Sequence, residues 1–92
     1  MLKIKPASQF KKDIKKFVHN KSVIHELDTV LKMLVRNQML PAKYQDHALS
    51  GKWKGYRECH IKPDALLIYF IDTGFELLIL ERFGSHAELF KS

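Results

Sequence analysis

The feature that most restricts the fold of this chain is an unbroken apolar run from Leu66 to Ile71. An apolar run of this length between turn sequences is typical of a β-strand that is buried on both faces. The turn sequences are Lys62-Pro63-Asp64 before the run and Asp72-Thr73-Gly74 after it. Strand-like sequence also extends from about Trp53 to Ile61 and from Phe75 to Phe83, which predicts a meander of three strands.

The first 37 residues have a helical period instead. A strand-like segment at Leu2–Ile4 ends at Pro6, and Ser8 and Ser22 are the expected N-caps of two amphipathic helices. The break between the two helices is short, so we expect them to be antiparallel neighbours. Their apolar stripes are Phe10, Ile14, Phe17 and Val18 in the first helix and Val23, Leu27, Val30, Leu31, Leu34 and Val35 in the second.

The predicted order is strand, helix, helix and then three strands, in a single domain over residues 1–92. This order predicts an α+β fold with two antiparallel N-terminal helices packed on a small, largely antiparallel four-stranded sheet. We expect residues 39–51 to be irregular and residues 86–92 to form a short tail. The helices would cover one face of the sheet, which leaves the other face for a site.

Several classes of protein are excluded by composition. The longest apolar run is far below the roughly 20 residues of a membrane span, and the N-terminus lacks the apolar region of a secretory signal. The single cysteine, Cys59, has no internal partner for a disulfide, which favours a reducing compartment. We therefore expect a cytoplasmic protein that has no membrane partner.

The charge is concentrated in the N-terminal part of the chain. The net charge is +6, and residues 1–36 hold nine Lys/Arg against three Asp/Glu, whereas the remainder holds seven of each. Such an asymmetry indicates a polyanion or an acidic protein as partner, although a solvated helix face is the simpler alternative. The predicted contact residues lie together on the first helix and are Lys11, Lys12, Lys15 and Lys16.

Most residues that are suited to acid–base chemistry lie in the second half of the chain. Strand alternation places Glu58 on the same face as His60, and Asp64 follows His60 across a turn. Cleavage of RNA requires one group that deprotonates the 2′-hydroxyl and one that protonates the leaving oxygen, and histidine titrates near neutral pH. A fixed cation stabilises the transition state, and no metal is needed. The catalytic candidates are His47, His60, His86, Asp64, Glu58 and Arg82.

Residues that can bind the substrate surround these candidates. Aromatic side chains stack on RNA bases, and lysines neutralise phosphates. The expected substrate-binding residues are Lys52, Lys54, Trp53, Tyr56 and Phe90. Alternatives remain open: the aromatic side chains are suited to packing, and Arg82 to an ion pair with Glu76 or Glu88. A zinc site built from His47, His60, His86 and Asp64 is chemically possible, but these residues lack paired ligand spacing.

The sequence of residues 46–64, DHALSGKWKGYRECHIKPD, resembles the signature of YafQ-type toxins in the RelE/ParE superfamily. The segments LLIY at residues 66–69 and RFGSHAELF at residues 82–90 fit the same pattern in the same order. The resemblance implies a RelE-like fold and an endoribonuclease that cuts mRNA in the ribosomal A site without a cofactor. It also implies a cognate antitoxin, which would bind a monomeric toxin and form a higher-order complex.

The resemblance assigns functions to individual positions. The functional histidines of the family correspond to His47, His60 and His86, its acidic residues to Glu58 and Asp64, its arginine to Arg82 and its C-terminal aromatic residue to Phe90. We expect His86 to be the general acid and His60, held by Asp64 or Glu58, to be the general base. His47 and Arg82 would bind the scissile phosphate.

Two departures from the family pattern raise alternatives. Ala65 stands where a tryptophan commonly follows the turn aspartate, and an aspartate can replace Glu58. A catalytically weak relative that only binds RNA therefore stays open. A toxin of the same fold that inhibits DNA gyrase, in the style of ParE, is a further alternative, but such a toxin would not need clustered histidines.

Overall fold

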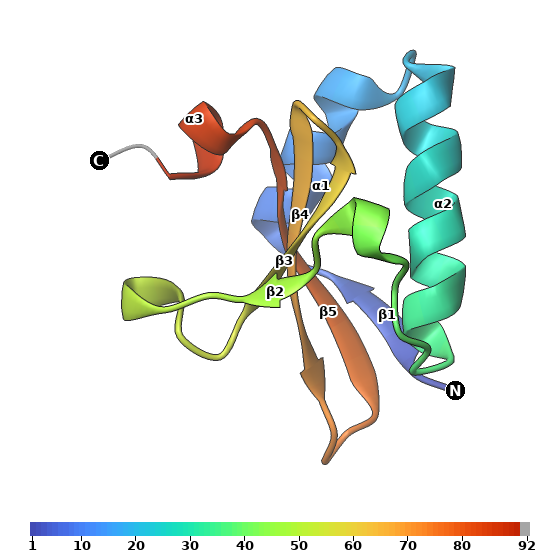
Figure 1. Ribbon diagram of the computed structural model, residues 1–92, viewed down its shortest axis with the longest axis vertical. Helices are drawn as coiled ribbons and strands as arrows, with labels where there is room; N and C mark the ends of the chain where they lie inside the picture. The colour runs from blue at the N-terminus through green and yellow to red at the C-terminus, as the bar shows by residue number, and fades with distance from the viewer. Residues whose placement is uncertain (91–92) are drawn as a thin grey trace.

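The structure is a computed structural model that describes residues 1–90, and its centre is a mixed five-stranded sheet (Figure 1). The order of the strands across the sheet is β1-β5-β4-β3-β2. β1 runs parallel to β5, and every other neighbouring pair is antiparallel. The strands are β1 (Lys3–Pro6), β2 (His47–Ala48), β3 (Arg57–Lys62), β4 (Ala65–Asp72) and β5 (Leu77–Gly84).

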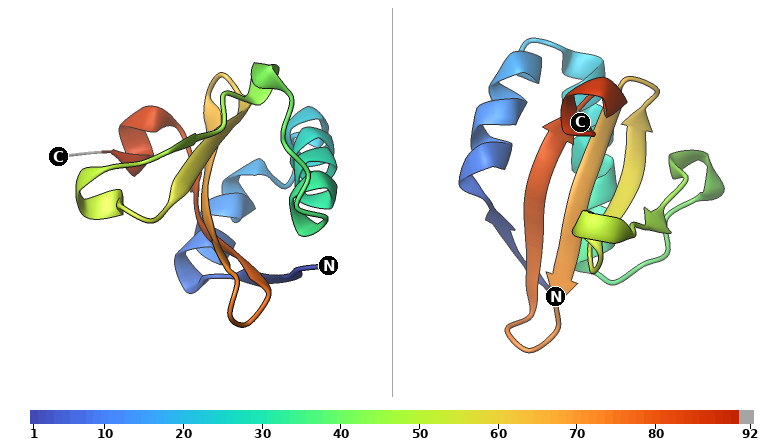
Figure 2. Two further views of the ribbon diagram at one scale, coloured as in Figure 1. Left: turned by 60° about the horizontal axis from the view of Figure 1, so that its bottom comes forward. Right: turned by 90° about the vertical axis from the view of Figure 1, so that its left-hand side faces the viewer.

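The two long N-terminal helices pack on one face of the sheet, which we call the helix face. α1 (Ser8–Ile14) contacts β5 and α2 (Lys21–Val35) contacts β3. The opposite face, which we call the histidine face, is covered by α3 (His86–Leu89) and by the 3₁₀ turn η3 (Gly51–Trp53) (Figures 1 and 2). The α+β prediction with helices on one face of a small sheet is confirmed.

β4 lies in the middle of the sheet and is buried on both faces. Leu67 and Tyr69 belong to the core under α1 and α2, whereas Leu66 and Ile68 pack with Leu89 of α3. The prediction of a doubly buried strand is therefore confirmed. Because β3 pairs with β4 in register, the same alternation continues in β3 and places its side chains on defined faces.

The number of strands was underestimated, because the sheet has five strands and not four. The fifth, β2, lies in the stretch that the sequence predicted to be irregular, and a pair of residues carries too little periodicity to be recognised. The strand expected from Trp53 begins only at Arg57. Gly51 (φ +66°) and Gly55 (φ +97°) turn the backbone on either side of Trp53, so this segment forms η3.

The predicted helix caps were wrong in both helices. Ala7 is the N-cap residue of α1, without a side-chain hydrogen bond, and Ser8 is already helical. The side chain of Asn20, and not that of Ser22, caps α2 by accepting a hydrogen bond of 3.2 Å from the backbone N–H of Val23. Asn20 has the extended backbone that a capping side chain needs.

The remaining connections contain short helical turns. η1 (Lys15–Phe17) continues α1, and η2 (Ala42–Tyr44) precedes β2. α3 lies in the segment that was predicted to be a tail. Over residues 1–90, no helix has both the length and the apolar character that a membrane span requires.

Candidate active site

The centre of the candidate site is the buried carboxylate of Glu58, which is 4% exposed on β3. Its Oε1 atom lies 3.4 Å from Nε2 of His47 and 3.6 Å from Nε2 of His60. The pairing of β2 with β3 sets His47 directly opposite Glu58, and strand alternation sets His60 on the same face. Three of the six catalytic candidates therefore form one cluster.

The second oxygen of Glu58 is buried and has no hydrogen-bond partner within residues 1–90. A buried acceptor without a donor costs free energy, and such atoms are unusual outside functional sites. Oε1 therefore faces both histidines, while Oε2 is left to accept from a further donor. A protonated histidine beside Oε1 forms a charge-assisted interaction.

The orientation of His47 is set by its own loop. Its Nδ1 atom lies 2.6 Å from the carbonyl oxygen of Gln45. Because a carbonyl oxygen only accepts, Nδ1 carries the proton and Nε2 is directed to Glu58. Gln45 has a left-handed backbone (φ 49°), which turns the chain from η2 toward β2.

Asp46 anchors the same loop to the body of the sheet. Its carboxylate accepts hydrogen bonds from the hydroxyl of buried Tyr69 (2.7 Å) and from the guanidinium of Arg57 (3.1 Å). The hydrogen bond to Asp46 raises the pKa of Arg57. Burial, together with the bond to Asp46, raises the pKa of Tyr69. Sequence reasoning did not identify Asp46, although its place directly before His47 was a signal.

His86 is held by a capping box at the start of α3. The Ser85 hydroxyl accepts from the backbone N–H of Glu88 (3.2 Å), and the Glu88 carboxylate accepts from the backbone N–H of Ser85 (2.9 Å). These bonds, together with Lys16, lower the pKa of Glu88. The ring of His86 lies 4.8 Å from that of Phe90.

α3 packs on the histidine face through Leu89 and Phe90. His86 is exposed on this short helix. In the described part of the chain, no hydrogen bond or ion pair joins His86 to His47, Glu58 or His60. The structure therefore brings His86 to the same face as the Glu58 cluster but not into direct contact with it.

Arg82 forms an ion pair with neither of the glutamates that were considered for it. Its Nε atom donates to buried Asp13 of α1 at 2.8 Å, and Asp13 also accepts from the backbone N–H of Phe83 at 3.0 Å. Burial raises the pKa of Asp13, but hydrogen bonds from Arg82, Phe83 and Gln9 outweigh that effect and hold the pKa below its ordinary value. Sequence reasoning missed Asp13, although the residue lies next to the apolar stripe of α1. A carboxylate at a buried position of a helix indicates that a cationic or hydrogen-bonding partner is buried with it.

No hydrogen bond or ion pair joins Asp64 to His60 in the described part of the chain. Asp64 is exposed at the turn between β3 and β4 and lines a recess with Phe17 and Val23 on the side of the helices. The carboxylate that reaches His60 is Glu58. Ala65 is 1% exposed in the core of the helix face, so the side chain at this position points away from the histidines.

The aromatic candidates form part of the histidine face. Trp53, Tyr56 and Phe90 are partly buried against Leu66 and Ile68. Trp53 and Tyr56 have ring centroids 5.2 Å apart and meet edge to face. Burial, followed by the nearby carboxylate of Glu81, raises the pKa of Tyr56.

The lysine candidates occupy two separate places. Lys52 and Lys54 are exposed at η3, beside the aromatic side chains. Lys11, Lys12 and Lys15 are exposed on the first helical segment, whereas Lys16 forms an ion pair of 3.0 Å with Glu88 of α3.

Comparison with known families identifies the chain. The family model described as the bacterial toxin of a type II toxin-antitoxin system, YafQ, matches residues 2–91. The chain belongs to the YafQ toxin family. The mRNA interferase toxin YafQ of Escherichia coli K12 is 41% identical over 88 residues, which cover 95% of this chain and 94% of that relative.

Solved structures of bacterial toxins share the whole fold. A metal-bound toxin from Helicobacter pylori is 46% identical with a TM-score of 0.89, and the match covers 98% of this chain and all of that one. YafQ in the E. coli DinJ-YafQ complex is 40% identical with a TM-score of 0.84, and the match covers 98% of this chain and 99% of that one. In the part of this chain that the structure describes, no three His, Cys, Asp or Glu side chains form a group suited to a metal ion.

Membership of the YafQ family establishes the activity. The protein is the toxin of a type II toxin-antitoxin system and an mRNA interferase, that is, an endoribonuclease. This confirms the family and the activity that the resemblance implied.

Proposed function

We propose that this YafQ-family toxin cuts mRNA in the ribosomal A site by histidine-based acid–base chemistry. The observation that carries the proposal is the Glu58 cluster, in which one buried carboxylate oxygen lies within 3.6 Å of two imidazole nitrogens. A buried carboxylate orients a histidine and stabilises its protonated form. The His60 side chain is 28% exposed, which leaves its ring accessible to a substrate.

In the proposed reaction, His60 is the general base and Glu58 holds its Nε2 edge. Nδ1 of His60 takes the proton of the 2′-hydroxyl, whose oxygen then attacks the adjacent phosphorus. The bond from phosphorus to the 5′-oxygen breaks, and His86 donates a proton to that oxygen. The products are a 2′,3′-cyclic phosphate and a 5′-hydroxyl end.

Two side chains are proposed to bind the phosphate. His47 is fixed by the carbonyl of Gln45, and Arg82 is fixed by Asp13. The guanidinium of Arg82 is a cation that is in place before the reaction, and such a group stabilises the developing negative charge without reorganisation. Lys52, Lys54, Trp53, Tyr56 and Phe90 would hold the flanking nucleotides, and the exposed location of Asp64 gives it no direct part in this scheme.

We assign the toxin two macromolecular partners in the bacterial cytoplasm, a cognate antitoxin and the translating ribosome. The antitoxin is supported by the solved complexes of E. coli YafQ with DinJ. The ribosome is supported by the exposed lysines of the first helical segment, since such a face attracts RNA phosphates. The free toxin is proposed to be a monomer that joins a larger complex with the antitoxin.

The proposal is tested by induction in growing bacteria, with primer extension on a reporter message. We expect growth arrest and new 5′ ends at fixed codon positions for the wild type and for His25→Gln, a matched control because His25 is exposed on α2. His60→Gln and His86→Gln should abolish both effects. Arrest without new 5′ ends would indicate another target, such as DNA gyrase, and cleavage by both variants would contradict the assigned roles.

A further inference from the structure

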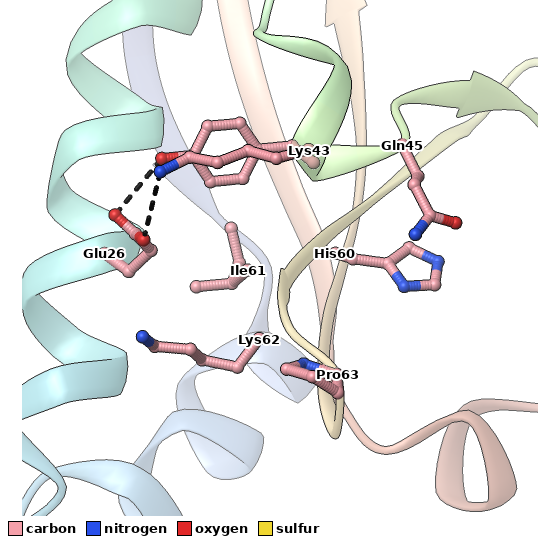
Figure 3. A pocket seen from close by; sticks show the side chains of 8 residues that line it. Glu26, Lys43, Gln45, His60, Ile61, Lys62 and Pro63 are labelled. Carbon is pink, nitrogen blue, oxygen red and sulfur yellow. Dashed lines mark hydrogen bonds and ion pairs between the residues drawn. The ribbon is translucent and has the colours of Figure 1, made fainter.

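A pocket that the proposed chemistry does not use lies directly beside His60 (Figure 3). It lies where α2, η2 and the end of β3 meet, and it is lined by Lys43, Gln45, Ile61, Lys62 and Pro63 together with His60. His60 therefore borders two spaces, the Glu58 cluster and this pocket. Whatever occupies the pocket is adjacent to the proposed general base.

The charge of the pocket favours an anion. Two lysines, Lys43 and Lys62, line it together with a single carboxylate, that of Glu26. This carboxylate is already engaged, because it accepts from the hydroxyl of Tyr44 at 3.1 Å and lies 3.8 Å from Nζ of Lys43. Lys62 thus leaves the pocket with a net positive charge, and phosphate groups are attracted to such a surface.

Gln45 connects the pocket to the catalytic cluster. Its side chain lies beside the ring of His60 at the pocket (Figure 3), while its carbonyl accepts from Nδ1 of His47 at 2.6 Å. The residue is held in the left-handed region (φ 49°), a backbone conformation that costs free energy and that is found at functional sites. Its amide offers a donor and an acceptor, the combination that reads the edge of an unpaired base.

We propose that this pocket binds the nucleotide of the message that adjoins the cleaved bond. Gln45 hydrogen-bonds the edge of the base, the exposed ring of Pro63 packs on its plane, and Lys62 binds the neighbouring phosphate. The pocket is thus a determinant of codon preference. This inference rests on the proposed function, because His60 is the group that places the pocket next to the reacting phosphate.

The test uses ribosomes programmed with messages that carry each of the four bases beside the cleaved bond. Cleavage is measured on these messages, and binding is measured on versions with a 2′-deoxy nucleotide at the cleaved position, which lacks the nucleophile. The variants are Gln45→Asn, which keeps an amide and tolerates the left-handed backbone, and Lys62→Gln. Lys32→Gln is the control, because Lys32 lies on α2 in an exposed ion pair with Asp28.

We expect Gln45→Asn to change the ratio of the cleavage rates for the preferred base and the other bases by about tenfold. This is the discrimination that one good side-chain contact to a base supplies. Lys62→Gln should raise KM and the Kd for the deoxy message severalfold with an unchanged kcat, and Lys32→Gln should match the wild type. If Gln45→Asn leaves the base preference unchanged and Lys62→Gln leaves KM and Kd unchanged, the proposal that this pocket binds the nucleotide is wrong. If the wild type binds but does not cleave, the proposed function fails, and the binding of the two variants still decides on the pocket.

Discussion

At the scale of single residues, Glu58 determines the geometry of the site. Its burial fixes the carboxylate, and the two histidines approach only one of its oxygens. The other oxygen lacks a donor in the described chain, so the free protein carries the cost of a buried acceptor without a partner. A buried carboxylate next to two imidazole rings is suited to position them.

Replacing this carboxylate by an amide tests its role. Glu58→Gln keeps the shape of the side chain but removes the charge that stabilises a protonated histidine. We expect cleavage to fall by about 100-fold, the range of general acid–base effects. The temperature of unfolding should not decrease, because a buried charge is removed. Equal cleavage by Glu58→Gln and the wild type would show that the charge is not used.

The ion pair of Asp13 with Arg82 contributes to the stability of the fold as well as to the site. Asp13→Asn leaves Arg82 and the backbone N–H of Phe83 without their charged acceptor. We expect the free energy of unfolding to fall by about 2 to 3 kcal/mol in denaturant titrations. Asp28→Asn, which breaks an exposed ion pair with Lys32, should change it by less than about 0.5 kcal/mol.

The same carboxylate contributes to the dependence of stability on pH. The pKa of Asp13 is lower in the folded state than its ordinary value of 3.8. Its contribution is therefore complete above pH 3.8 and is lost as the pH falls through the lowered pKa. Below pH 3.8 the stability of the wild type should approach that of Asp13→Asn, and a constant difference across this range would contradict the assignment.

At the scale of secondary structure elements, α3 shows how a very short helix is made rigid. Four residues are too few for an isolated helix, so its capping box and its packing on Leu66 and Ile68 hold it in place. Gly84 permits this arrangement, because a Cβ atom there would lie 3.0 Å from Oε1 of Glu88. The position of His86 therefore depends on Glu88, which does not take part in the chemistry.

This dependence predicts different effects for two substitutions of Glu88. Glu88→Gln retains an acceptor for the capping box, whereas Glu88→Ala removes it together with the interaction with Lys16. We expect Glu88→Ala to lower kcat by about tenfold through the misplacement of His86, with KM nearly constant. Glu88→Gln should retain most of the activity. If both variants have the wild-type kcat, α3 is positioned by packing alone.

At the scale of the whole molecule, the sheet separates two surfaces with different tasks. The histidine face carries the Glu58 cluster and α3 with His86, and the first helical segment carries exposed lysines. Lys16 differs from the other three lysines, because its ion pair with Glu88 links this segment to α3. The proposed contact with ribosomal RNA is therefore assigned to the other three lysines, Lys11, Lys12 and Lys15.

The ribosome contact is tested by replacing these three lysines with glutamine. We expect weaker binding to ribosomes and a salt dependence that is shallower by about one counterion for each lost phosphate contact. The toxin should still fold, because all three side chains are exposed. A matched variant that also loses three positive charges, with Lys21→Gln and Lys32→Gln on α2 and Arg36→Gln at its C-cap, controls for net charge. An equal loss of ribosome binding in both variants would show that the effect is not specific to the first helical segment.

The sequence by itself determined the α+β class, the doubly buried β4 and the shared face of Glu58 and His60, because periodicity and strand alternation are local properties. It did not reveal β2, Asn20 as the cap of α2, or the pairing of Arg82 with Asp13. β2 and the pairing of Arg82 with Asp13 depend on contacts between separate segments, whereas the cap at Asn20 is local and was missed because Ser22 is also a capping residue type. The family pattern suggested a stacking group at position 65, but Ala65 lies among the core residues under the helices, so the side chain at this position does not face the histidines.

Only the tertiary structure decided which carboxylate lies next to His60. Asp64 and Glu58 are both close to His60 in sequence, but the pairing of β2 with β3 brings His47 onto Glu58, and the turn leaves Asp64 exposed. The pocket beside His60 was likewise decided by packing, since it joins residues of α2, η2 and β3. Sequence patterns specify faces and elements, whereas a site is formed by the register and packing between them.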